Sequence, residues 1–171
     1  EQVPPGSRSC DANSYDGYDQ SVTVVRNALT ARDAAYDVVI GHSQGAILLT
    51  AMMAEGQLPL KTIEKCILNG VAWPNPYSLQ LQSLNERHNN RQSVPFDKLM
   101  MIVGETDTIN PPEGAMQVRD AFRKCYTMDD GDGDGNPTDD AIRTVHHDGG
   151  HSLPVRNPDV LSQMTDFILN I

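Results

Sequence analysis

The chain has no surplus of positive charge. Its 171 residues include 13 Lys and Arg against 23 Asp and Glu, which gives a net charge of −10 and a pI near 4.7. Phosphate backbones and anionic lipid surfaces do not attract such a chain, so we expect no nucleic-acid partner and no binding to a membrane surface. The chain also lacks a run of 18 apolar residues, so no transmembrane helix is predicted.

Cysteine is scarce as well. Cys10, Cys66 and Cys125 are odd in number, lie far apart and include no Cys-x-x-Cys pair. This usage argues against a disulfide framework or a zinc ribbon and fits a reducing compartment. We therefore expect a cytoplasmic protein, and its length and 39% hydrophobic content allow one domain over residues 1–171 with a sizeable core.

Helical and strand-like patterns alternate along the chain. The predicted helices begin near residues 18, 46, 78, 110 and 158, and the predicted strands cover residues 36–40, 66–71, 99–103 and 142–146. Alternation of this kind is typical of a parallel sheet covered by helices on both faces. The sequence therefore predicts an α/β fold, in the form of a three-layer sandwich with a mostly parallel sheet.

Two of the helix starts carry capping signals. Asn110 is predicted to cap a helix that has Pro111 at its first position and Glu113 as the capping-box acid. Asn157 followed by Pro158 predicts the start of the last helix in the same way.

The strongest chemical signal is Gly41-His42-Ser43-Gln44-Gly45, which lies between a buried strand and an apolar helix. A serine at such a sharp strand-to-helix turn has its hydroxyl exposed at the carboxyl end of the sheet. We expect both flanking glycines to be required, because a Cβ at either position would crowd the neighbouring strand and helix. The motif predicts that Ser43 is a nucleophile.

A serine hydroxyl needs a base to remove its proton. In chains with this kind of serine turn, an acid and then a histidine follow later in the sequence. Asp107 follows the strand at 99–103 and is the favoured acid, with Glu105 as the alternative. Among three competing histidines, His151 is favoured over His146 and His147 because the preceding glycine pair lets its ring turn back over the sheet. His42 and His88 have no partner pattern and are interpreted as packing and surface residues.

These segments together resemble the FSH-type serine hydrolases of the α/β-hydrolase superfamily. The similar stretches are Tyr18-Asp19-Gln20-Ser21, Gly41-His42-Ser43-Gln44-Gly45-Ala46, Gly104-Glu105-Thr106-Asp107 with Pro111-Pro112, and Gly149-Gly150-His151-Ser152-Leu153-Pro154. The resemblance implies Ser43 as nucleophile, His151 as base and Asp107 as the acid that orients it. No metal or organic cofactor is expected.

The resemblance also implies an oxyanion hole, for which the backbone N–H of Gln44 is one predicted donor. Members of this fold normally begin with a strand and a His-Gly-like loop that supplies the second donor, and nothing before Tyr18 is similar to it. We therefore expect the chain to be the C-terminal part of a longer hydrolase, truncated on its N-terminal side, with one sheet edge exposed.

Two segments stand apart from this pattern. Residues 73–97, rich in Pro, Asn and Gln, form either a lid or acyl pocket lined by Trp73, Tyr77, Leu79 and Leu81, or a local packing cluster. The acidic loop at 128–140 matches four positions of an EF-hand calcium loop, but Ala141 stands where the bidentate Glu is needed. A solvated insertion is the favoured interpretation of this loop, and no metal site is predicted.

The leading functional prediction is hydrolysis of small to medium acyl esters through an acyl-enzyme on Ser43. An acyl-thioesterase would use the same three residues, and the sequence does not separate the two activities. A non-catalytic binding module with a hydrolase-like scaffold is the alternative from another class, and a calcium-responsive domain rests on the acidic loop alone. The expected partner is a small ester or thioester, and a homo-oligomer is compatible with the predicted sheet edge.

Overall fold

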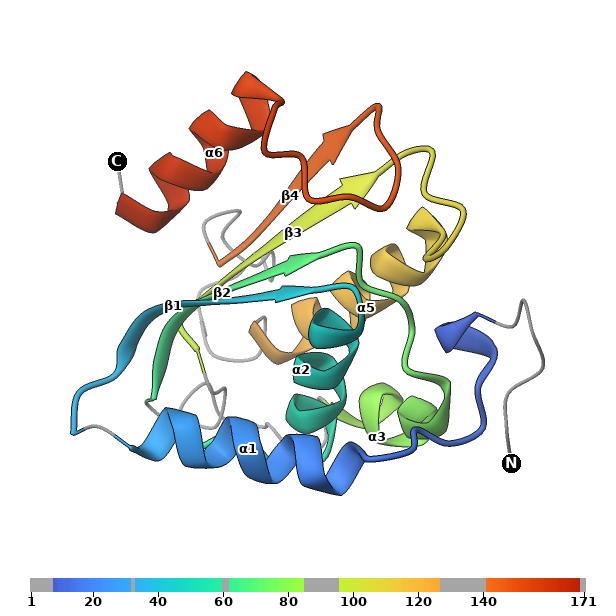
Figure 1. Cartoon of the computed structure of the whole chain (residues 1–171), viewed down its shortest axis with the longest axis vertical. Coiled ribbons are helices and arrows are strands. Elements are labelled where there is room, and N and C mark those ends of the chain that lie inside the picture. Colours follow the sequence, from blue (N-terminus) through green and yellow to red (C-terminus); the bar gives the residue numbers. More distant parts are fainter. Residues whose placement is uncertain (1–7, 32, 60–61, 85–95, 127–140, 170–171) are drawn as a thin grey trace, which may run out of the picture.

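A parallel sheet of four strands forms the centre of the protein. The computed structural model describes residues 8–31, 33–59, 62–84, 96–126 and 141–169. The strands lie side by side in sequence order (Figure 1) and are β1 (Tyr36–His42), β2 (Ile63–Asn69), β3 (Lys98–Gly104) and β4 (Ile142–His147). In the parallel register Ile67 pairs with Ile40 and Met100, while Ile102 pairs with Val145. All four strands therefore end at the same edge of the sheet.

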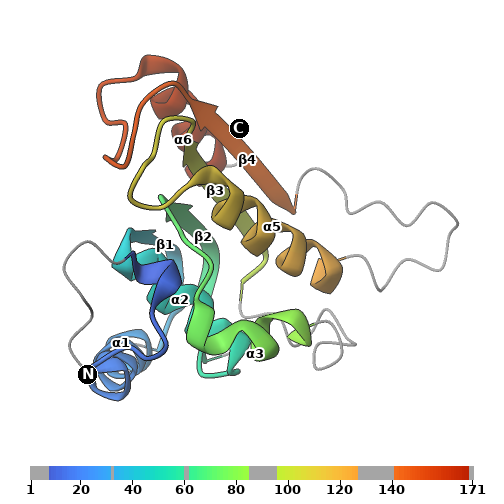
Figure 2. The same cartoon turned by 90° about the vertical axis from the view of Figure 1, so that its right-hand side faces the viewer.

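Helices connect the strands and cover both faces of the sheet. Helices α1, α2 and α5 lie on one face and α6 lies on the other (Figures 1 and 2). Their bounds are α1 (Tyr18–Thr30), α2 (Gln44–Ala54), α3 (Ser78–Gln82), α5 (Pro112–Tyr126) and α6 (Pro158–Leu169), with short 3-10 turns at Ser9–Asp11 and Asn75–Tyr77. This arrangement confirms the α/β fold class that the alternating pattern predicts.

The sheet divides the core into two clusters because successive strand side chains point to opposite faces. In β3, Met101 packs toward α2 and α5, whereas Met100 and Ile102 pack toward α6. Phe167 of α6 closes the smaller cluster, and Phe122 of α5, 1% exposed, is among the largest side chains of the other. The apolar composition of both faces of β3 follows from its central position under two helical layers.

β1 is an edge strand of the described sheet and pairs only with β2. Ile40 is 45% exposed there, on the face that carries α6. On the opposite face, α1 packs against α2, and the Tyr18 hydroxyl donates a 2.9 Å hydrogen bond to Glu55. Burial and this hydrogen bond raise the pKa of Tyr18 well above its ordinary value. None of the described helices is long and apolar enough to cross a lipid bilayer.

Two predicted boundaries differ from the structure. β2 begins at Ile63 rather than Cys66 and ends at Asn69, because Gly70 turns the chain with φ of +57°. The prediction that Asn110 caps α5 is wrong, since that helix begins at Pro112 and its first turn closes on the Pro111 carbonyl. The backbone and side chain of Asn110 have other partners, which belong to the site described below.

The predicted cap of α6 is confirmed. Asn157 Oδ1 accepts hydrogen bonds from the backbone N–H groups of Asp159 and Val160, at 3.1 and 3.2 Å. Pro158 occupies the first helical position, where a missing N–H costs nothing because no intrahelical acceptor is available there.

Of the two segments outside the α/β pattern, residues 73–97 are described in part and residues 128–140 are not described. The acidic loop at 128–140 lies outside the described residues, and so do residues 85–95. In the described part of residues 73–97, Leu81 is buried in the core and Leu79 is 78% exposed, while Trp73 donates a hydrogen bond to Ser78. Leu81 thus packs locally; the lid or pocket stays a prediction.

A matched pair of valines tests where the stability of this fold lies. Val118 of α5 is fully buried, so Val118→Ala removes two methyl groups from the core and should lower the free energy of unfolding by about 2 kcal/mol. Val24 of α1 is 68% exposed, and the same substitution there should change stability by less than about 0.5 kcal/mol. Urea denaturation measures both, and equal losses at the two positions would contradict the described packing.

Candidate active site

The turn between β1 and α2 exposes Ser43 in a strained backbone conformation. Ser43 has φ of 53° and ψ of −118°, and it is the one non-glycine residue with positive φ in the described part of the chain. Its N–H donates to the Asn69 carbonyl and its carbonyl accepts from Ile47 N–H, both at 3.0 Å. Strain of this kind costs about 1–3 kcal/mol and persists only where the surroundings hold it.

The two glycines around the turn are not equivalent. A Cβ on Gly41 would lie 2.8 Å from the Ala46 Cα, so the strand can approach α2 only with glycine there. A Cβ on Gly45 would meet nothing within 4 Å. The expected requirement is therefore confirmed for Gly41 and wrong for Gly45, where the added carbon would point into open space.

His151 connects Ser43 to Asp107 through two short hydrogen bonds. The Ser43 hydroxyl donates to His151 Nε2 at 2.6 Å, and the Nδ1–H of His151 donates to Asp107 Oδ2 at 2.8 Å. Ser43 follows β1, Asp107 follows β3 and His151 follows β4, so the shared edge of the parallel sheet brings three distant segments together. The arrangement has the geometry that proton transfer from a serine hydroxyl to an imidazole requires.

The carboxylate of Asp107 is held by its own loop. Its Oδ1 accepts hydrogen bonds from the backbone N–H groups of Ile109 and Asn110, both at 2.9 Å, which leaves Oδ2 for His151. The Asp107 side chain is 2% exposed, whereas that of His151 is 17% exposed and open to a reactant. The Asp107 carboxylate is thus fixed and shielded from water, and the His151 ring is accessible.

Close backbone approaches position the loop that carries His151. The carbonyl oxygen of Gly149 lies 2.6 Å from the place a Cβ on Gly104 would occupy, so a side chain there would displace the loop. Glu105 N–H donates to the His147 carbonyl at 2.9 Å, and Thr106 N–H donates to the Gly149 carbonyl at 3.3 Å. These contacts tie the loop after β4 to the loop after β3.

The chain as a whole is similar to a known protein family. The chain matches the family model described as serine hydrolase (FSH1) over residues 6–162. The protein belongs to the FSH1 serine hydrolase family. Among curated proteins, a search finds no match to the chain. Family membership and the four-stranded parallel sheet make the protein a serine-type hydrolase of the α/β-hydrolase superfamily.

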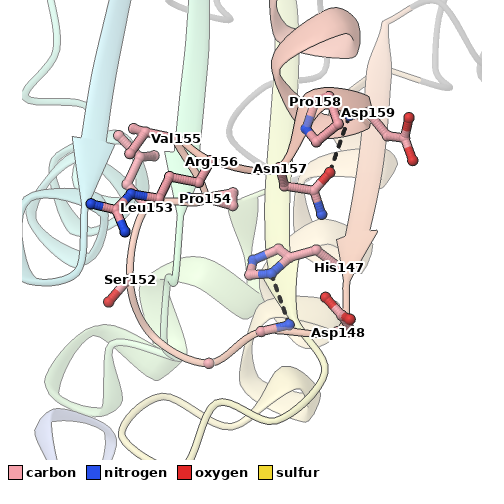
Figure 3. Close-up of a pocket in the computed structure, with 12 residues that line it drawn as sticks. His147, Asp148, Ser152, Leu153, Pro154, Val155, Arg156, Asn157, Pro158 and Asp159 are labelled. Atoms are coloured by element: carbon pink, nitrogen blue, oxygen red, sulfur yellow. Dashed lines mark hydrogen bonds between the residues drawn. The ribbon is translucent and has the colours of Figure 1, made fainter.

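The other predicted acid and bases lie apart from Ser43 in this FSH1 family member. Glu105 is 52% exposed and pairs with Nδ1 of the exposed His146 on the outer side of the sheet edge. His147 is buried, and its Nδ1 accepts a 3.1 Å hydrogen bond from Gly149 N–H. It lines a cavity of about 750 Å³ between the loop after β4 and the start of α6 (Figure 3), whose lining includes neither Ser43 nor Asp107.

Sequence reasoning missed the polar groups packed around the Ser43–His151 pair. His42, expected to be a packing or surface residue, accepts a 2.7 Å hydrogen bond at Nδ1 from the buried Asn69 amide, and its ring centroid lies 5.4 Å from that of His151. Asn110, expected to be a helix cap, lies between Asp107 and Gly70. No local pattern signals the His42–Asn69 bond or the bond from Asn110 to Gly70, because each joins segments that are far apart in the sequence.

The described part of the chain offers few other reactive groups. Among the described residues, Cys10 and Cys66 are free thiols, and complete burial raises the pKa of Cys66 to about 12. A thiol with that pKa is not a nucleophile at neutral pH. The described residues contain no cluster of three or more His, Cys, Asp or Glu side chains suited to a metal ion.

The backbone N–H of Gln44 opens α2 and has no intrahelical acceptor, so it can donate to a bound oxyanion.

Two neighbouring acids provide a matched test of this geometry. Asp107→Asn should slow reaction of Ser43 with a fluorophosphonate by about 1000-fold or more, because the amide favours the wrong tautomer of His151. Glu105→Gln removes a charge of the same sign two residues away and should change the rate by less than about threefold, since Glu105 contacts His146 instead. Labelling rates measure both variants, and a larger loss in Glu105→Gln would contradict the assignment of the acid.

Proposed function

We propose that the protein hydrolyses carboxylic esters of small to medium acyl groups through an acyl-enzyme on Ser43. The observation that carries the proposal is the 2.6 Å hydrogen bond from the Ser43 hydroxyl to His151 Nε2, with Asp107 bonded to the other nitrogen of the same ring. Membership of a serine hydrolase family supports the reaction class, and the ester substrate is our inference from this geometry.

In the first half of the reaction, Ser43 Oγ attacks the ester carbonyl carbon while its proton passes to His151 Nε2. Asp107 keeps Nδ1 protonated and stabilises the imidazolium that forms. Collapse of the tetrahedral intermediate breaks the bond to the alcohol oxygen, and His151 returns its proton to that leaving group. An ester of Ser43 with the acyl group remains.

The negative charge of the intermediate needs donors that are fixed in advance. The N–H of Gln44 is our proposed donor, since it follows Ser43 directly and belongs to the first turn of α2. The positive end of the α2 dipole lies at the same place and favours the oxyanion. One such donor contributes about 100- to 1000-fold to the rate in serine hydrolases.

In the second half, His151 accepts a proton from water, whose oxygen attacks the acyl carbonyl of the Ser43 ester. The acid leaves with the new oxygen, and His151 returns the proton to Ser43 Oγ. Both halves use the same three side chains and the same Gln44 donor.

A thioester would follow the same path with sulfur in place of the alcohol oxygen, and this is the second candidate function. A non-catalytic binding module is the contrasting hypothesis, and the strained turn at Ser43 argues against it, because a purely structural strand-to-helix turn does not need that strain. The free thiols Cys10 and Cys66 support a reducing compartment such as the cytoplasm.

Labelling with a fluorophosphonate ester tests whether Ser43 is activated. We expect one phosphonyl group per chain, detected by intact mass, and no label on Ser43→Ala. His151→Gln should slow labelling by at least about 1000-fold, because the serine hydroxyl is then without its base. An unlabelled wild-type chain that is folded by circular dichroism would exclude the proposed hydrolase activity in favour of the binding module.

Paired substrates separate the two candidate activities. A 4-nitrophenyl ester and the corresponding 4-nitrophenyl thioester, compared for acyl chains of two to twelve carbons, differ only in the leaving atom. We expect a higher kcat/KM for the ester with a maximum at a short or medium chain. A consistent preference for the thioester across the series would replace the proposed function by thioester hydrolysis.

A further inference from the structure

Asn110 joins the loop that carries Asp107 to the end of β2, next to the His151 ring. Its backbone N–H donates to Asp107 Oδ1 at 2.9 Å, and its side-chain Nδ2–H donates to the Gly70 carbonyl at 2.6 Å. The residue is 3% exposed, so water does not compete for either bond. One residue thus connects the loop after β3 with the end of β2.

Gly70 lies directly against the ring of His151. A Cβ on Gly70 would be 3.3 Å from both Nδ1 and Cε1 of that ring, and the glycine has φ of +57°. Its N–H donates to the Ile102 carbonyl at 3.1 Å, and its carbonyl accepts the bond from Asn110. The backbone of Gly70 therefore limits how far the imidazole can move toward the end of β2.

In the described part of the chain, the side-chain amide of Asn110 bonds through its nitrogen only. Its Oδ1 is buried and has no hydrogen-bond partner among the described residues, which is unfavourable for a polar atom. Leucine has a similar shape and would fill the same space without a buried unpaired oxygen. Leucine, however, could not donate to the Gly70 carbonyl. What asparagine provides here, and leucine would not, is the hydrogen bond to Gly70, the residue that lies against the His151 ring.

We propose that Asn110 is a positioning residue that holds His151 against Asp107 in the tautomer needed for catalysis. The inference rests on the proposed function and deepens it. Only the Nδ1–H tautomer leaves Nε2 free to accept the Ser43 proton, and the bond from Nδ1 to Asp107 selects that tautomer. Release of the Gly70 carbonyl lets the ring move off Asp107, and the other tautomer, which cannot act as the base, gains population.

Asn110→Leu tests the proposal with two readouts. We expect kcat for 4-nitrophenyl butanoate to fall by about 10- to 100-fold with little change in KM, because Asn110 orients the base and does not touch substrate. Nitrogen NMR of the protein labelled at histidine should show a larger fraction of the Nε2–H tautomer at His151. The spectrum of His151→Gln identifies the signal of His151 among the five histidines.

Lys65→Met is the matched control. Lys65 Nζ also donates a 2.6 Å hydrogen bond to a backbone carbonyl, that of Ile168, and Lys65 is 6% exposed. The bond lies near the start of β2, at the other end of the strand from Gly70. Loss of a buried donor there should leave both kcat and the His151 tautomer unchanged.

A folded Asn110→Leu variant with wild-type kcat and an unchanged tautomer would overturn the proposal. A loss of kcat without a tautomer change would overturn it too, since Asn110 would then act elsewhere than on His151. If Asn110→Leu does not fold, Asn110→Ser gives the same test, because its side chain is too short to reach Gly70. Absence of fluorophosphonate labelling in the wild type would instead refute the proposed function, and the tautomer comparison would still decide the role of Asn110.

Discussion

The hydrogen bond between Ser43 Oγ and His151 Nε2 sets the strictest geometric requirement on this fold. At 2.6 Å it joins two residues 108 positions apart, and it forms only if strands β1 and β4 end at the same edge of the sheet. A parallel sheet meets this requirement directly, because every strand ends on the same side and each crossover helix is placed on a face. The fold is therefore the means by which distant side chains meet.

The backbone at a few small residues sets the distances between these side chains. Gly41 lets β1 approach α2, and Gly104 lets the loop after β4 cross β3. Gly70 turns the chain under the His151 ring, where a side chain would crowd the imidazole. Strain at Ser43 is tolerated because bonds to Asn69 and Ile47 hold the turn on both sides. Small residues at the sheet edge thus control the distances between the large polar ones.

Much of this organisation could be predicted from the sequence because it is encoded locally. Apolar periods predict the order of strands and helices, and the Gly-x-Ser-x-Gly motif predicts the turn at Ser43. Asp107 and His151 follow from chain order and from the glycines beside them, and the structure brings both to Ser43. The start of α6 also follows from its own residues, Asn157 and Pro158.

The contacts that could not be predicted depend on three-dimensional proximity. Asn110 has every local mark of a helix cap, yet α5 begins two residues later and the Asn110 side-chain amide donates to Gly70, 40 residues away in the sequence. His42 and Asn69 lie on neighbouring strands and meet only through the parallel register. The expectation that position 45 requires glycine was wrong for a related reason. The space around a turn depends on which face of the helix is covered by the rest of the protein.

A crystal structure of the protein with a short alkyl boronic acid tests the central claim most directly. Boron is a tetrahedral analogue of the acyl carbon under attack, so the account predicts a covalent bond from Ser43 Oγ to boron. It also predicts one boron hydroxyl within hydrogen-bond distance of the Gln44 N–H, with His151 still bonded to Asp107. Boron bound to another residue, or a covalent adduct with its hydroxyl groups turned away from Gln44, would contradict the assignment of nucleophile and oxyanion donor.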